Sequence, residues 1–223
     1  MQKNYRIPSD IDIWDAENVF YLRSHPSRLA KLLAHYELYS RIVNLPGAIV
    51  ECGVYKGASL CRFATFRSLL ENNHSRKIYG FDAFGAFPTE GLASSADQSF
   101  VESFEAAGGE GISVQDLEAA LAAKEVSNFE LHAGNVFDSV PAFLEKQPHL
   151  RIAMLHLDLD VYEPTKACLD LFLPHMARGG LIVFDDYNSV EGATRAADEL
   201  CQAEGFEIEK LPFYNVPAFL EVR

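Results

Sequence analysis

The sequence predicts an α/β fold, a doubly wound and mostly parallel sheet of seven strands that ends in an antiparallel hairpin. Short runs typical of β-strands alternate with stretches of helical periodicity, which is the pattern of a parallel sheet covered by helices on both faces. The last two runs lie close enough in the chain to pair as a hairpin. With 223 residues, of which 48% are hydrophobic, the chain suits one large core, so we expect a single domain over 1–223.

The first expected element is a helix over 28–43, where apolar residues recur at helical spacing until Pro46 and Gly47. It belongs to an N-terminal helical segment, 1–45, that leads into the core and can act as a lid. A β-type run interrupted by glycines, a helical stretch and a second β-type run come next. These elements are a strand over 48–54, a helix over 59–70 and a strand over 77–82.

Residues 85–112 are rich in Gly and Ser and only weakly periodic, so the sequence predicts a mobile lid there. Its second half has room for a short helix at about 100–106. Ser113 and Asp116 resemble a capping box, which predicts a helix as far as Lys124.

The second half of the chain continues the alternation, and the apolar run of its central strand predicts burial on both faces. The last helix in this half is expected to end at Gly205. The expected elements are strands over 129–134 and 151–160, a helix over 165–176, a strand over 179–187, a helix over 192–203, and paired edge strands over 206–211 and 217–223.

The composition excludes several classes of partner. The net charge is −13, and the sequence contains no run rich in Lys and Arg, so we expect no nucleic-acid partner. The four cysteines show no C-x-x-C spacing and are expected to be reduced, which favours a cytoplasmic protein. The sequence shows neither an export signal nor about 18 consecutive apolar residues, so we expect no membrane partner.

Polar residues gather where the predicted parallel strands end, which is where ligands bind in such sheets. The first strand runs into Glu51-Cys-Gly53-Val-Tyr55-Lys-Gly57-Ala-Ser59, whose glycines allow a tight turn and close approach of a ligand. The spacing matches neither a phosphate-binding loop nor a dinucleotide fingerprint. S-adenosylmethionine (SAM) fits better, because its amino-acid end suits the turn and its ribose diol suits an acid on the next strand, Asp82. An ordinary strand-to-helix turn with a solvated Asp82 is the alternative.

A cluster of carboxylates follows the fourth and fifth strands. Strand alternation would put His156, Asp158 and Asp160 on one side. If the two strands are neighbours, Asp185 and Asp186 converge on them. Such anions repel one another unless a hard cation such as Mg²⁺ or Mn²⁺ binds between them, where it would lower the pKa of an acceptor hydroxyl. Ordinary bonds from these acids to Lys, Arg or backbone amides are the alternative.

Together these motifs resemble the macrocin/mycinamicin O-methyltransferase family, sugar-hydroxyl methyltransferases of antibiotic biosynthesis. The resemblance covers most of residues 28–200. The matching strings are Pro46-Gly-Ala-Ile-Val-Glu-Cys-Gly-Val-Tyr-Lys-Gly57, Phe81-Asp-Ala-Phe84, His156-Leu-Asp-Leu-Asp-Val-Tyr-Glu-Pro-Thr-Lys166, Gly179-Gly-Leu-Ile-Val-Phe-Asp-Asp-Tyr187, Gly192-Ala193 and Ala197-Asp-Glu199.

The resemblance implies a Rossmann-like class I SAM methyltransferase that forms homo-oligomers, dimers or tetramers. It implies Mg²⁺ or Mn²⁺ at Asp158, Asp185 and Asp186 and a catalytic base at Asp160, with His156 as the other candidate for the base. The expected acceptor is a hydroxyl of a sugar or glycoside, in a natural product or a surface-glycan precursor. The residues expected to contact SAM are Glu51, Gly53, Val54, Tyr55, Gly57, Ser59, Asp82, Ala83, Asn135, Val136 and Asp158.

The sequence departs from the family after the second strand, where the usual Phe-Glu-Gly-Leu-Pro is Phe84-Gly-Ala-Phe-Pro88, so the acceptor stays open. One rival is a catechol or phenolic O-methyltransferase. Those enzymes have a lysine base three residues after the first metal aspartate, where this chain has Val161. A non-catalytic SAM- or nucleotide-binding module is the rival from another class, and a nicotinamide oxidoreductase ranks last because its glycine fingerprint is absent.

Overall fold

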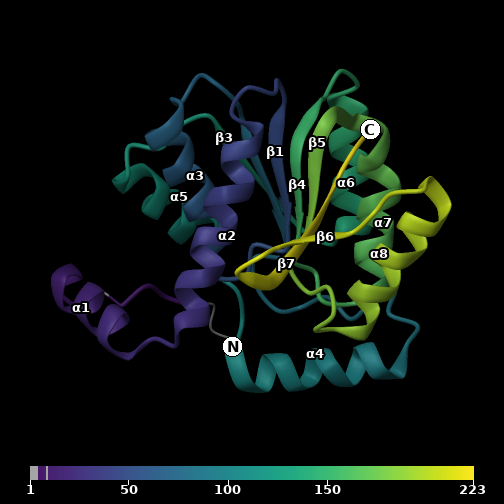
Figure 1. Cartoon of the computed structure of the whole chain (residues 1–223). Coiled ribbons are helices and arrows are strands. Elements are labelled where there is room, and N and C mark those ends of the chain that lie inside the picture. The colour runs from purple at the N-terminus through teal and green to yellow at the C-terminus, as the bar shows by residue number, and fades with distance from the viewer. Residues whose placement is uncertain (1–4, 9) are drawn as a thin grey trace.

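The computed structural model, which describes residues 5–8 and 10–223, confirms the predicted sheet (Figure 1). Seven strands lie in the order β3-β2-β1-β4-β5-β7-β6, and only β7 and β6 run antiparallel to their neighbours. The central strands β1 and β4 are wholly buried, as the apolar run of β4 predicts. The strands are β1 (Ala48–Cys52), β2 (Ile78–Asp82), β3 (Phe129–Ala133), β4 (Ile152–Leu157), β5 (Met176–Phe184), β6 (Glu209–Leu211) and β7 (Tyr214–Glu221).

Helices cover both faces of the sheet (Figure 1). Helices α2, α3 and α5 lie on one side and α6, α7 and α8 on the other, whereas α4 runs across one end of the strands. Among the described residues, no helix has the length and apolar character needed to cross a membrane. The helices are α1 (Ile13–Arg23), α2 (Pro26–Ile42), α3 (Ala58–Leu70), α4 (Ser95–Gly108), α5 (Val114–Ala123), α6 (Val136–Lys146), α7 (Tyr162–Phe172) and α8 (Glu191–Glu204), with a short 3₁₀ turn at Leu173–His175.

Alternation along the strands divides the interior into two cores. In β1, Val50 and Cys52 pack with α6, α7 and α8, while Ile49 packs with α2 and α3. Glu51 follows the alternation of Ile49 and therefore faces α2 and α3. The same rule places His156 of β4 on that side, since Glu51 and His156 are partners in the register of the parallel strands.

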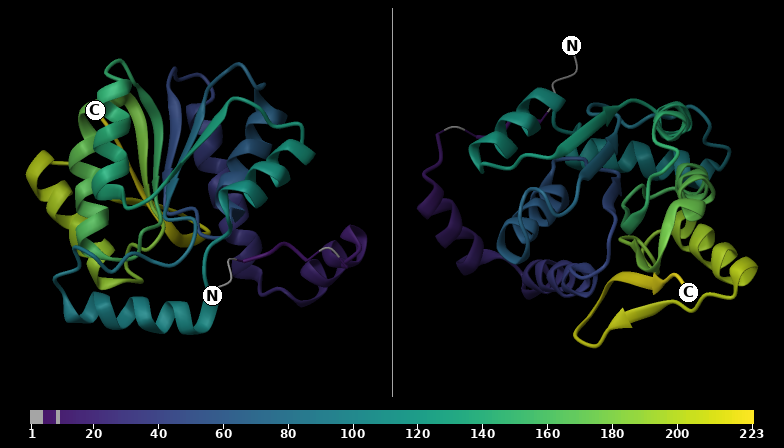
Figure 2. Two further views of the ribbon diagram at one scale, coloured as in Figure 1. Left: turned by 180° about the vertical axis from the view of Figure 1, so that it is seen from behind. Right: turned by 90° about the horizontal axis from the view of Figure 1, so that it is seen from above.

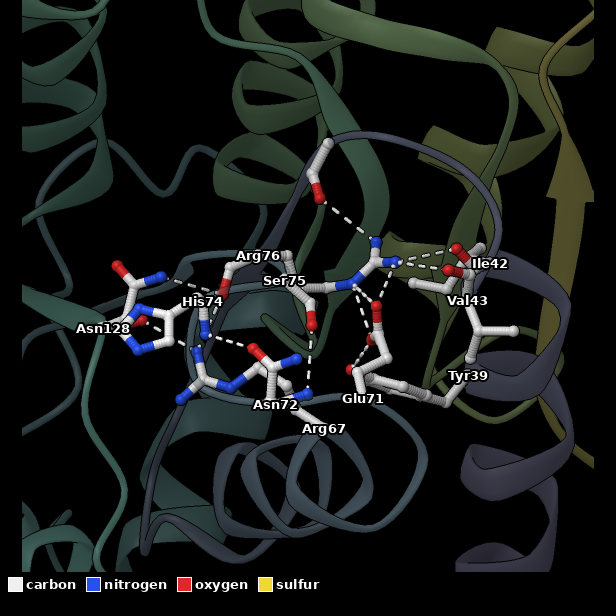
Figure 3. Close-up of polar contacts among 11 residues, drawn as sticks. Tyr39, Ile42, Val43, Arg67, Glu71, Asn72, His74, Ser75, Arg76 and Asn128 are labelled. Carbon is white, nitrogen blue, oxygen red and sulfur yellow. Dashed lines mark hydrogen bonds and ion pairs between the residues drawn. The ribbon is translucent and has the colours of Figure 1, made fainter.

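A polar network fastens the amino-terminal ends of the strands (Figure 3). Arg76 binds both carboxylate oxygens of Glu71 and donates to the carbonyls of Gly47 and Ile42 at 3.1 and 2.9 Å. Buried Arg67 donates to the carbonyls of Arg76 and Asn128 at 2.9 Å. Buried charges are stable only when paired and hydrogen-bonded in this way. The network therefore joins the ends of α2 and α3 to the starts of β1, β2 and β3, and lies at the edge of the sheet away from the carboxyl ends.

The structure corrects several expected boundaries. The fourth strand ends at Leu157, so it does not extend through Asp160, which has a left-handed backbone (φ 63°). The helix expected over 165–176 begins three residues earlier and stops before Pro174, because proline has no N–H to continue the helical hydrogen bonds. The short helix expected near 100–106 is the longer α4. The helix α6 was not predicted.

The N-terminal segment is helical, as expected, although residues 1–4 and 9 of it lie outside the described part of the chain. Helix α1 has no buried residue and stands away from the sheet (Figure 2). Helix α2 packs against α3 and β7. The segment thus contains one helix that belongs to the core and one that does not.

Candidate active site

A cavity of about 400 Å³ opens at the carboxyl ends of the parallel strands. It is the place where ligands bind in doubly wound sheets, and its size is within the usual range for small-molecule sites. Three residues that the sequence suggested for the site, Glu51, Gly57 and His156, lie outside its lining. The suggested residues that line it are Gly53, Val54, Tyr55, Ser59, Asp82, Ala83, Asn135, Val136, Asp158, Asp160, Asp185 and Asp186.

The turn after β1 brings the backbone of two strand ends into contact. Gly53 has a φ of 89°, and a Cβ atom on it would lie 1.8 Å from the carbonyl oxygen of Asp158. The amide of Asp158 in turn donates to the carbonyl of Cys52 at 2.9 Å. Only glycine allows this approach. The turn then reaches Gly57 (φ 81°), where α3 begins.

Asp82 braces this turn from the end of β2. One carboxylate oxygen accepts hydrogen bonds from the amides of Val54 and Tyr55 at 2.8 and 2.9 Å, and the other accepts from Phe84 at 2.6 Å. Burial raises the pKa of Asp82, and these three amides counteract the rise. The carboxylate has four lone-pair positions, so it keeps acceptor capacity for a ligand hydroxyl.

Three aspartates form a cluster at the ends of β4 and β5. Asp158, Asp185 and Asp186 each offer one oxygen, and these oxygens lie within 4.8 Å of one another. Burial and the neighbouring carboxylates hold the pKa of Asp158 well above its usual range and raise that of Asp186 to about 8. Oxygens Oδ1 of Asp185 and Oδ2 of Asp186 are buried without a hydrogen-bond partner among the described residues. The cluster is therefore short of positive charge.

Beneath the cluster lies a buried ion pair. His156 Nδ1 is 3.1 Å from Oε1 of Glu51, and His156 Nε2 is 3.5 Å from Oδ1 of Asp185. Burial alone would lower the pKa of His156, but the two carboxylates outweigh it and raise the pKa to about 10. His156 is thus a buried imidazolium that orients Asp185, and it has no surface on the cavity. Asp185, in contrast to Asp158, has a pKa held well below its usual range by His156, His35 and Lys31.

Asp160 lies on the cavity wall beside this cluster. Its left-handed backbone turns the chain away from β4, and its carbonyl accepts from the amide of Ala193 at 3.2 Å. Burial and the charge of Asp185 raise the pKa of Asp160 to about 6. A carboxylate with a pKa near neutrality can accept a proton from a bound hydroxyl.

Sequence reasoning missed the residues that α2 and α3 contribute. Lys31 of α2 forms an ion pair with Asp185, and buried His35, one turn further, lies 3.6 Å from Asp185 Oδ1. Arg28 of α2 and Arg62 of α3 also line the cavity. The available signal was the spacing of Arg28, Lys31 and His35, which places three basic side chains on one face of the expected helix.

His35, His156 and Asp185 form a second group whose ligand atoms lie within 4.8 Å of one another. Both histidines are fully buried and neither lines the cavity. Burial lowers the pKa of His35 to about 4, whereas His156 is protonated. A protonated imidazole cannot ligate a metal, so the carboxylate trio on the cavity wall suits a hard cation better than this group.

The segment expected to be a lid lies over the cavity. Helix α4 crosses the carboxyl end of the sheet (Figure 1), and Phe104 and Glu105 line the cavity. The Tyr55 hydroxyl donates to the carbonyl of Gly108 at 2.8 Å. At the other end of the helix, Asp97 accepts from the amide of Tyr162 at 3.0 Å. The cover is therefore an ordered helix anchored at both ends.

Comparison with known proteins gives a consistent picture. The model of the macrocin O-methyltransferase (TylF) family matches residues 26–211. A tetracenomycin rhamnosyl 4′-O-methyltransferase of Streptomyces olivaceus is 29% identical over 64% of this chain. The chain spans about half of that curated relative, since the match covers 54% of its length.

Solved structures share the fold. CalS11, described as a calicheamicin methyltransferase, is 27% identical and superimposes with a TM-score of 0.72, covering 96% of this chain and 86% of that one. The O-methyltransferase NovP, at 19% identity, has a TM-score of 0.74 over 86% of this chain and 78% of its own, a likeness of fold alone.

Proposed function

The chain belongs to the macrocin O-methyltransferase (TylF) family, and from this membership we propose that it transfers the methyl group of SAM to a hydroxyl of a sugar or glycoside. The family match confirms the resemblance that the sequence motifs suggested. The carboxylate cluster beside the glycine turn is the observation that carries the proposal, because it brings acid–base chemistry into the cavity that fits the cofactor. Two relatives support a sugar acceptor, since the descriptions of the Streptomyces enzyme and of CalS11, a TDP-rhamnose 3′-O-methyltransferase, both specify rhamnose.

SAM is assigned to the side of the cavity formed by the glycine turn. Gly53, Val54 and Tyr55 line the cavity there, and Ser59 offers a hydroxyl. The remaining acceptor capacity of Asp82 suits the ribose diol. When bound, SAM would supply an activated methyl group on its sulfonium. The acceptor oxygen would take that methyl as the sulfur–carbon bond breaks, and its proton would pass to a base of the chain.

Mg²⁺ or Mn²⁺ fits Asp158, Asp185 and Asp186. Their oxygens are mutually close, and Oδ2 of Asp186 is buried without a hydrogen-bond partner among the described residues. The raised pKa values of Asp158 and Asp186 reflect uncompensated negative charge. A bound cation would supply the positive charge that lowers the pKa of a nearby hydroxyl. His156 and Lys31 hold Asp185 ionised, which keeps this ligand in the required protonation state.

Asp160 is our choice for the base that accepts the proton of the acceptor hydroxyl. Its side chain lies on the cavity wall, whereas His156 is enclosed between two carboxylates. The catechol-type alternative requires a base at the position of Val161. Val161 is fully buried and packs with Leu92 and Val101, so that position has no access to an acceptor.

Three measurements test these assignments separately. Calorimetry with S-adenosylhomocysteine should show binding, and Asp82→Ala should weaken it; absence of heat release would refute the cofactor assignment. Asp158→Asn should abolish turnover that depends on added Mg²⁺, and full activity in EDTA would refute the metal assignment.

Asp160→Asn should lower kcat about 100-fold or more with little change in cofactor affinity, while the exposed Asp170→Asn serves as the control.

A further inference from the structure

The cavity of this acidic protein contains a pair of arginines that lack an anionic partner. Arg28 of α2 and Arg62 of α3 both line it. Arg28 is exposed and Arg62 is half-buried, so the pair lies toward the open side of the cavity. Neither guanidinium makes a hydrogen bond or an ion pair within the described ranges 5–8 and 10–223. The two lysines of the cavity do have partners, since Lys31 pairs with Asp185 and Lys56 donates to the carbonyl of Gly108.

The two guanidinium groups are close enough to repel one another. Burial and, next, the positive charge of Arg28 lower the pKa of Arg62. The carboxylates that attract Arg62, those of Asp185, Glu51 and Asp158, act without direct contact. Asp185 and Glu51 already have partners in Lys31 and His156. Holding two cations together without an anion in contact is unfavourable, and a bound anion would relieve the cost.

We infer that Arg28 and Arg62 bind the diphosphate of a nucleoside diphosphate sugar, so that this chain methylates the sugar while it is still activated. The inference rests on the proposed sugar methylation and specifies its acceptor. Guanidinium groups bind phosphate oxygens through paired hydrogen bonds, which makes arginine the preferred side chain for such a group. A neutral glycoside would leave both cations unpaired.

The position of the pair suits such an acceptor. Arg28 precedes Lys31 by three residues and Arg62 follows Ser59 by three, so each shares a helix face with a residue at the carboxylate cluster or the glycine turn. The arginines and the carboxylates belong to one cavity, which lets a single ligand reach both. The diphosphate then lies at the open side and the sugar hydroxyl lies at Asp160. The product retains its leaving group, so the reaction that consumes it is a glycosyl transfer.

Steady-state kinetics with two acceptors test the inference. For TDP-rhamnose, Arg28→Gln and Arg62→Gln should each raise KM about tenfold or more and leave kcat within a few-fold. The KM for neutral methyl rhamnoside should not change. Arg178→Gln, at an exposed arginine outside the cavity, is the matched control and should behave as wild type. Equal effects of the arginine variants on both acceptors, or no effect on either, would overturn the inference.

Binding of TDP alone, measured by calorimetry, keeps the test independent of turnover. TDP should bind the wild-type chain and lose at least tenfold in affinity in each arginine variant. If S-adenosylhomocysteine affinity falls instead and TDP affinity does not, the pair holds the carboxylate of the cofactor and the inference is wrong. Failure of the wild-type chain to methylate either sugar, with TDP binding intact, would count against the proposed function and leave the anion site supported.

Discussion

Gly53 is the residue at which the backbone itself shapes the cavity. Its missing side chain lets the turn after β1 lie against the carbonyl of Asp158, which joins the cofactor side of the cavity to the carboxylate side. The pairing of β1 with β4 continues into this contact through the bond from Asp158 to Cys52. One backbone contact therefore sets the spacing between the two halves of the site.

Gly53→Ala should disrupt both folding and cofactor binding. A Cβ atom 1.8 Å from a carbonyl oxygen forces the two strand ends apart, so we expect the free energy of unfolding to fall by about 4 kcal/mol or more. Gly205→Ala is the control, because Gly205 has a similar φ of 72° but nothing within 4 Å. It should cost about 1–2 kcal/mol. Urea denaturation measures the free energy of unfolding of both variants. Equal losses in the two variants would contradict the account based on the close contact at Gly53.

His156 gives stability a characteristic dependence on pH. Its pKa is raised from 6.5 to about 10 in the folded chain, so the folded state binds the proton more tightly than the unfolded state. The stabilisation is complete below pH 6.5 and is lost as pH rises toward 10. We expect the free energy of unfolding to fall by on the order of 1 kcal/mol per pH unit over this window.

Urea denaturation in EDTA across that window, with His156→Gln for comparison, measures the effect. The variant should be less stable at pH 7 and should lose less stability as pH rises. His149→Gln, at an exposed histidine, is the control. Identical slopes for wild type and His156→Gln would mean that His156 is not the buried imidazolium described above.

At the scale of elements, α4 acts as a cover of the cavity that is fastened to the start of α7. Val101 packs in a small core of its own with Leu92 and Val161, and Asp97 accepts from the first amide of α7. This packing is local and separate from the two large cores. A cover held by few contacts can open without unfolding the sheet.

Asp97→Ala should loosen α4 selectively. Buried Asp97 satisfies the amide of Tyr162, so its removal leaves an orphaned donor and frees one end of the helix. Hydrogen exchange in Ser95–Gly108 should accelerate about tenfold, while exchange in β1 and β4 stays unchanged. The exposed Glu102→Ala, on the same helix, is the control. Uniform acceleration throughout the chain would show that Asp97 supports the whole fold instead.

The elements that the sequence predicted best are those with a single strong periodicity, such as α2 and α3. Helix α6 escaped because Pro141 lies in its interior, although Val136, Val140 and Phe143 follow helical spacing and Asn135 caps its start. Helix α4 was underestimated because only two of its residues are buried. A few apolar residues do not predict a full-length helix in a segment rich in Gly and Ser. The helix becomes evident only when the surface on which those residues pack is known.

At the scale of the whole molecule, the sheet topology explains why much of the site was predictable. Parallel strands end at one edge, so residues such as Asp82 and Asp185 had to lie near the same cavity once the strands were recognised. Lys31 and Arg62 were not predictable in this way. Their positions depend on how α2 and α3 pack on the sheet, and on which helix faces meet the strand ends.

The exposed apolar surface of α1 supports the proposal that the chain forms homo-oligomers. Trp14 is 70% exposed and Leu22 is 84% exposed, although hydrophobic side chains of this size seldom gather on a free surface. We propose that a second copy of the chain packs against this surface of α1. Light scattering should give a multiple of 24.8 kDa.

Leu22→Glu should lower that mass, whereas Leu69→Glu, at a 72% exposed leucine on α3, should not. Trp14 is the only tryptophan in the sequence, so its emission should shift to longer wavelength when the oligomer is diluted. A monomer mass at every concentration would contradict the assignment.

The central claim is that the aspartates at the strand ends prepare a sugar hydroxyl for methylation by SAM. Its most direct test is to follow an isotopically labelled methyl group from SAM in the presence of Mg²⁺, with TDP-rhamnose and catechol offered together. The account predicts that mass spectrometry finds the label on a rhamnose hydroxyl, and that Asp160→Asn removes it. Label on catechol alone, or unchanged labelling of the sugar by Asp160→Asn, would contradict the account.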